Sequence, residues 1–121
     1  MTKKDQLQRL QQVAALMFDS KLALLKTVAR ARQDTEDHLV NLATAPVLLP
    51  DLDPMAMAMA VARLRYEGWA DVRRAELNLI LARQTAAWLD AREEARFAFG
   101  KTQALEAVRA KVTAASLPLI P

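Results

Sequence analysis

The methionines at positions 55, 57 and 59 are the first side chains of this sequence whose type and spacing suggest chemistry. Thioether sulfur is a ligand for soft ions such as Cu(I). A strand would place the three sulfur atoms on one side, but each step of two residues turns a helix by about 200°, so a helix scatters them around its axis. The chain has no cysteine and one histidine, His38. We therefore interpret the methionines as part of the first turns of a helix and predict no metal site.

Acid–base and nucleophilic chemistry also lack a complete set of residues. Asp90, Glu93 and Glu94 lie within one helical turn, but arginines interleave with them. A carboxylate pair that acts as general acid and base needs a sheltered cleft, which an exposed helix of mixed charge does not provide. We interpret His38 as structural, because no nucleophile lies near it in the sequence. Glycine-rich phosphate loops are absent as well. The sequence therefore predicts a protein that is not an enzyme, with no catalytic residue and no cofactor.

Aromatic and arginine side chains indicate protein binding instead. Tyr66 and Trp69 share a helical face, and Arg73 follows Trp69 by four residues, within cation–π reach. Tryptophan, tyrosine and arginine are typical of the residues that dominate protein interfaces. The alternative interpretation is that Trp69 and Trp88 pack inside the fold. The candidate protein-binding residues are Tyr66, Trp69, Arg73, Trp88, Phe97, Phe99 and Leu105.

The composition predicts an all-α protein. Only two glycines and one tyrosine occur in 121 residues, whereas strong helix formers are abundant. We expect one helical domain over residues 1–121.

Charge and hydropathy narrow the expected partners and location. The 17 basic and 14 acidic residues are interspersed along the chain, a pattern that argues against nucleic-acid binding. The longest stretch without charge, "HLVNLATAPVLLP", is too short and too rich in proline to cross a bilayer. The N-terminus lacks the apolar region of a signal peptide. We expect a cytoplasmic protein without a membrane span.

The first expected helix covers residues 2–43. Thr2 and Asp5 resemble a capping box. A heptad pattern then predicts a coiled-coil-like seam that needs a partner helix. The expected a positions are Leu7, Ala14, Lys21, Val28, Thr35 and Leu42, and the expected d positions are Leu10, Met17, Leu24, Ala31, His38 and Ala45.

A turn at residues 44–54 separates this helix from a second, expected over residues 55–115. Pro46 and Pro50 break helical geometry, and Asp53 followed by Pro54 is a helix start signal. The tail, residues 116–121, contains two prolines and should be extended. The expected seam of the second helix contains Val61, Leu64, Gly68, Val72, Ala75, Leu79, Ala82, Ala86 and Leu89, and it resumes at a rotated phase with Ala91, Ala95, Ala98, Thr102, Leu105 and Val112.

The unequal helix lengths leave two architectures open. One is an antiparallel two-helix coiled-coil hairpin in which the longer second helix extends past its partner from about Arg96 onward. The other is a three-helix bundle, in which the second helix bends near Gly100 and folds back.

The pattern resembles one family of helical proteins. The stretches "LQRLQQVAALMFDSKLALLKTVARAR" and "WADVRRAELNLILARQTAAWLDAREEARFAFGKTQALEAV" are similar to the FliJ/YscO-like coiled-coil stalk proteins of bacterial flagellar and type III secretion export. The resemblance implies an antiparallel two-helix coiled coil that binds the export ATPase and contacts the export gate, peripheral to a membrane export complex. The alternative is a generic helical adaptor or a homo-oligomer of another pathway.

Overall fold

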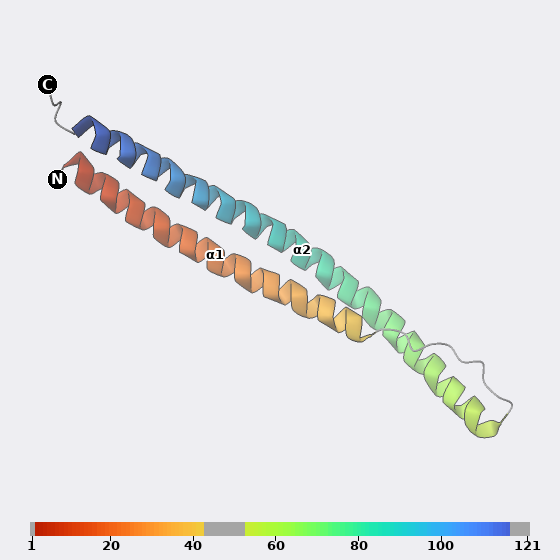
Figure 1. Cartoon of the computed structure of the whole chain (residues 1–121). Helices are drawn as coiled ribbons and strands as arrows, with labels where there is room; N and C mark the ends of the chain where they lie inside the picture. Colours follow the sequence, from red (N-terminus) through yellow and green to blue (C-terminus); the bar gives the residue numbers. More distant parts are fainter. Residues whose placement is uncertain (1, 43–52, 117–121) are drawn as a thin grey trace. The chain divides into compact units, whose positions relative to one another are not determined.

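Two long helices make up the described part of the chain. The structure, a computed structural model, describes residues 2–42 and 53–116 (Figure 1). Helix α1 spans Lys3–Asn41 and helix α2 spans Pro54–Ser116, and no strand occurs in the described residues. The predicted all-α architecture with a longer second helix is confirmed. Because α2 continues through Gly68 and Gly100, the alternative of a third helix formed by a bend near Gly100 is not realised.

The helix starts follow the signals in the sequence. The backbone N–H of Thr2 donates to the Asp5 carboxylate at 3.3 Å, and the N–H of Asp5 donates to the Thr2 hydroxyl at 3.2 Å, which completes a reciprocal capping box. At α2, the Asp53 carboxylate accepts from the N–H of Met55 at 3.4 Å. The expected turn at 44–54 and the expected tail at 116–121 lie largely outside the described residues.

The chain divides into two compact units, each made from a segment of α1 and a segment of α2. Unit 1 contains residues 1–29 and 87–121, and unit 2 contains residues 30–86. Single-domain behaviour stays a prediction, because the compactness of each unit does not show whether the two unfold together.

In unit 1 the first half of α1 packs antiparallel against the last part of α2. Phe18 lies against Phe99 with ring centroids 5.4 Å apart. Towards the two helix termini, the Gln11 side chain donates to the Glu106 carboxylate at 3.2 Å. Small side chains allow close approach of the helices and form the buried core, which contains Ala14, Ala91, Ala95 and Ala98.

These contacts correct the predicted overhang. Residues after Arg96 were expected to extend past the end of α1, but Phe99 and Glu106 pair with α1. In unit 2, Arg74 donates to the carbonyl oxygen of Leu42, the last described residue after α1, so the surplus length of α2 lies at its N-terminal end. The prediction failed because it placed the start of α2 directly opposite the end of α1.

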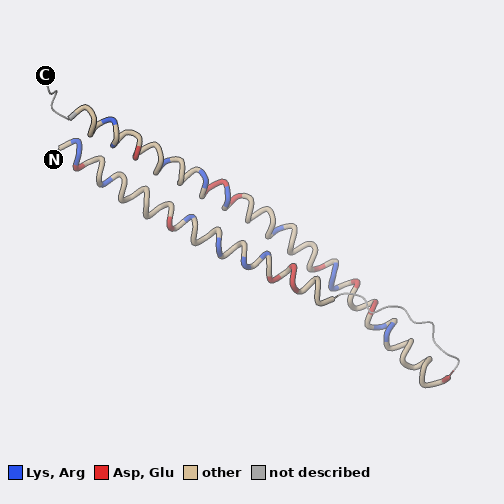
Figure 2. Tube along the Cα trace, viewed as in Figure 1, with Lys and Arg blue, Asp and Glu red and all other residues tan. Residues whose placement is uncertain are grey.

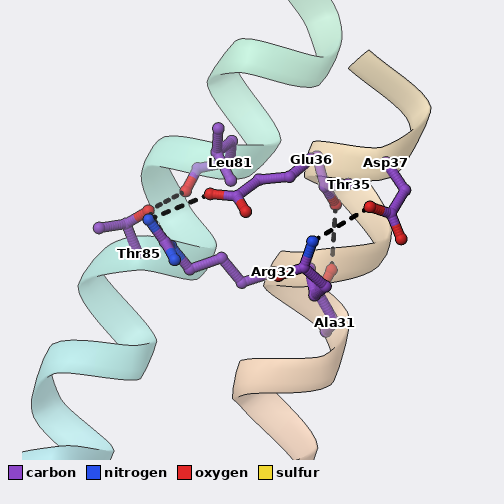
Figure 3. Close-up of polar contacts among 8 residues, drawn as sticks. Ala31, Arg32, Thr35, Glu36, Asp37, Leu81 and Thr85 are labelled. Atoms are coloured by element: carbon purple, nitrogen blue, oxygen red, sulfur yellow. Dashed lines mark hydrogen bonds and ion pairs between the residues drawn. The ribbon is translucent and has the colours of Figure 1, made fainter. Parts of the chain in front are cut away.

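The core of unit 2 is small and partly polar. Leu42, Ala70 and Leu77 are buried together, with Leu39 packed against them. A polar layer follows along α1 (Figure 3), where Arg32 donates to the Thr85 hydroxyl at 3.0 Å and pairs with Glu36 at 3.2 Å. Polar side chains that bond each other across paired helices favour one register.

The exposure pattern also corrects the predicted seams. The expected a positions of α1 are buried or half-buried, but Leu10, Met17 and Leu24 at d are exposed. The neighbouring positions Phe18 and Leu25 are half-buried instead. Every residue of the predicted α2 seam from 61 to 89 is exposed, whereas its rotated continuation at Ala91, Ala95, Ala98, Thr102 and Leu105 is buried or half-buried.

The reason is that each helix carries two apolar faces. Leu10 and Phe18 are both large and apolar, so periodicity alone cannot show which of their positions faces the partner helix. The choice follows from how α1 and α2 fit together, which the pattern of one helix does not contain. One apolar face of α1 therefore stays exposed in unit 1.

Candidate functional site: an apolar groove in unit 1

An open apolar groove runs between the two helices of unit 1. Its volume is about 610 Å³. Its α1 wall carries Leu10, Val13 and Met17, and its α2 wall carries Phe97 and Leu105. The remaining lining residues are Ala14, Lys21, Glu94, Ala98, Lys101 and Ala104.

The large side chains of the groove remain accessible to solvent. Phe97 is 69% exposed, Leu10 is 56% exposed, and Val13 and Met17 are about as exposed. The floor is formed by Ala14 and Ala98, which are buried and too small to fill the space between the walls. Contiguous exposed apolar side chains of this kind typically mark interaction surfaces.

Charged groups lie along the rim of the groove. Lys21 and Glu94 join the two walls through an ion pair of 2.9 Å. Both side chains are more than a third exposed, so water screens this pair and its contribution to stability is small. The Lys101 ammonium lies over the Phe97 ring, 4.7 Å from its centroid, a cation–π contact. Lys101 has no carboxylate partner in the described residues, so the rim keeps an uncompensated cation beside the most exposed aromatic ring.

The structure brings two of the seven candidate residues into this groove. Phe97 and Leu105 line it, but Phe99 packs against Phe18 outside it. Trp88 is half-buried, and the Arg92 guanidinium lies 5.6 Å from its ring centroid.

The other three candidates lie together in unit 2. The rings of Tyr66 and Trp69 are 5.8 Å apart and both are exposed. Arg73 forms an ion pair with Glu76 at 3.1 Å and, with Trp69, lines a shallow hollow of about 180 Å³ that includes the exposed His38. The predicted interface therefore separates into one surface in each unit.

Sequence reasoning missed the α1 wall of the groove. Leu10 and Met17 were assigned to the seam, and Val13 and Lys101 were not considered. The sequence did contain a signal of this exposed wall. Helix α1 has apolar residues both at d and at the neighbouring heptad position, and a single seam cannot bury both sets.

The described residues contain no group of three or more histidine or carboxylate side chains that could hold a metal ion. Neither α1 nor α2 contains an apolar stretch long enough to cross a membrane. Comparisons with protein-family models, curated proteins and solved structures found no match to this chain.

Proposed function

We propose that this chain is a non-enzymatic coiled-coil accessory protein that binds another protein through the apolar groove of unit 1. The observation that carries the proposal is the exposure of Phe97, Leu10 and Val13 on facing helices around a floor of alanines. A helix laid into this groove would remove these side chains from water, at about 25 cal/mol for each Å² of apolar surface buried.

The sequence pattern supports the choice of partner. Its resemblance to the FliJ/YscO-like stalk proteins points to the bacterial flagellar or type III export ATPase, with the export gate as a further partner. In this proposal the protein works in the cytoplasm beside the membrane export complex.

A pull-down with purified export ATPase tests this function. The variant Phe97→Asp removes the aromatic ring and places a hydrated charge in the groove, and it should abolish capture, because binding would have to strip water from the carboxylate. Met59→Asp is the matched control, since Met59 is similarly exposed on α2 but lies outside the groove. Circular dichroism should show full helicity for both variants. The proposal is contradicted if the wild-type chain captures no ATPase, or if Phe97→Asp captures as much as wild type.

A second candidate function is self-association through the outer face of α2. We call Val61, Leu64, Val72 and Leu79 the outer stripe; all four are exposed and follow heptad-like spacing. Such a face is typical of a helix that packs against a further helix. Sedimentation velocity of wild type and of Val72→Asp/Leu79→Asp tests this candidate, which requires a wild-type oligomer that the double variant converts to a monomer.

A further inference from the structure

The antiparallel pairing in unit 1 gathers charge that is dispersed in the sequence. The first turns of α1 and the last turns of α2 lie at the same end of this unit (Figure 2). The chain contains 17 Lys/Arg and 14 Asp/Glu residues. Segments 2–13 and 101–116 together contain six of the Lys/Arg residues but only two of the Asp/Glu residues. The six cations are Lys3, Lys4, Arg9, Lys101, Arg109 and Lys111. This basic end therefore has a net charge of +4, more than the +3 of the whole chain.

The two carboxylates of the basic end are already engaged. Asp5 accepts a hydrogen bond from the N–H of Thr2 within the cap of α1, and Glu106 accepts one from Gln11. Lys101 contacts the Phe97 ring. Lys4 and Arg109 border a cleft of about 110 Å³ that also contains Leu7 and Val112. Lys101 thus borders the apolar groove itself, whereas Lys4 and Arg109 border a separate, smaller cleft that is also partly apolar.

The apolar groove and this charge together define a partner. We infer that the groove of unit 1 binds an amphipathic helix whose apolar stripe is flanked by glutamate or aspartate. The apolar side chains would fill the space around Phe97, while a carboxylate on the helix flank would pair with Lys101. This inference rests on the proposed function and adds the chemistry of the bound segment.

The groove favours such a helix over a nucleic-acid backbone. A phosphate backbone is recognised by clustered cations and hydrogen-bond donors. The groove presents Leu10, Val13 and Met17 along one wall, and these side chains have neither a hydrogen-bond donor nor a positive charge for a phosphate. An acidic amphipathic helix satisfies both the apolar walls and the cationic rim.

Fluorescence anisotropy with the full-length chain and two labelled helical peptides tests the inference. The peptides share one apolar stripe of leucines and differ only in flanking residues, glutamate in one and lysine in the other. We expect the Glu-flanked peptide to bind about tenfold more tightly, equal to 1.4 kcal/mol. Added salt should reduce this preference, since exposed charges are screened.

Two charge-reversal variants make the test specific. Lys101→Glu should weaken the Glu-flanked peptide severalfold and strengthen the Lys-flanked one. Lys26→Glu makes the same change in charge at an exposed position of α1 outside the groove lining, and should leave the preference unchanged.

The possible outcomes separate this inference from the proposed function. Equal affinity for both peptides, with binding lost in Phe97→Asp, would overturn the acidic preference and leave a helix-binding groove. Binding of neither peptide would overturn the inference, whatever the result of the ATPase pull-down. An oligonucleotide that displaces the Glu-flanked peptide would also overturn it, as would sedimentation showing a wild-type oligomer that Phe97→Asp converts to a monomer.

Discussion

At the scale of single residues, Phe97 and Phe99 show how helical rotation separates two roles. Two residues turn a helix by about 200°, so the two rings point to opposite sides of α2. Phe99 meets Phe18 from α1, while the Lys101 ammonium lies over the Phe97 ring. Phe99 therefore belongs to the packing between the helices, and Phe97 belongs to the surface that a partner can cover.

The two phenylalanines should accordingly differ in their effect on stability. We expect Phe99→Ala to lower the free energy of unfolding by about 1 kcal/mol, because it removes the aromatic pair with Phe18, although the Phe99 side chain is 46% exposed. We expect Phe97→Ala to change it by less than about 0.5 kcal/mol. Urea denaturation followed by circular dichroism measures both values. The reverse order would mean that Phe97, not Phe99, holds the helices together.

At the scale of elements, the continuity of α2 makes its glycines costly. Gly68 and Gly100 lie inside the helix, their backbones are not left-handed, and a Cβ added at either would meet no atom within 4 Å. Glycine in a helix is less favourable than alanine by about 0.8–1.0 kcal/mol, mainly through the entropy of the unfolded chain.

The substitution Gly100→Ala should therefore stabilise the protein. The expected gain in the free energy of unfolding is about 0.5–1 kcal/mol, measured by urea denaturation. Gly68→Ala is the matched substitution in unit 2 and should have a similar effect. Destabilisation by Gly100→Ala alone would indicate that the chain needs a bend at residue 100.

The register of α1 against α2 in unit 1 can be tested by cross-linking. The chain has no cysteine, so two introduced thiols report on one pair of positions. Gln11→Cys/Glu106→Cys should form an intramolecular link with a short bis-maleimide, because these side chains are in contact. Lys4→Cys/Glu93→Cys is the matched control, at positions that would be level if α2 began directly opposite the end of α1. Preferential linking of the control pair would contradict the register described above.

The sequence predicted the elements better than their contacts. Helix-forming composition, the Thr2 and Asp53 caps and the absence of internal proline identify two long helices, and all of these are local properties. The faces of α2 depend on α1, and residues such as Leu79 are as apolar as Leu77, although only Leu77 is buried. The α1 wall of the groove was missed for the same reason, since Leu10 is as suitable for a seam as for a surface.

At the scale of the whole molecule, the central feature is the combination of apolar and basic surface at one end of unit 1. The contributing residues are far apart in the sequence, because the groove is lined by residues between 10 and 21 and between 94 and 105, and the cations lie between 3 and 9 and between 101 and 111. The described residues have no large side chain that is fully buried, and this leaves much apolar surface available to a partner. In our proposal, this surface binds a helix.

Methyl NMR of the full-length chain, titrated with the Glu-flanked peptide, tests this claim most directly. The methyl signals of Leu10, Val13 and Leu105 should shift together with one dissociation constant, because all three line the groove. The signals of Val72 and Leu79 should stay in place. Shifts confined to the outer stripe, or no saturable shift in the groove, would contradict helix binding by the groove.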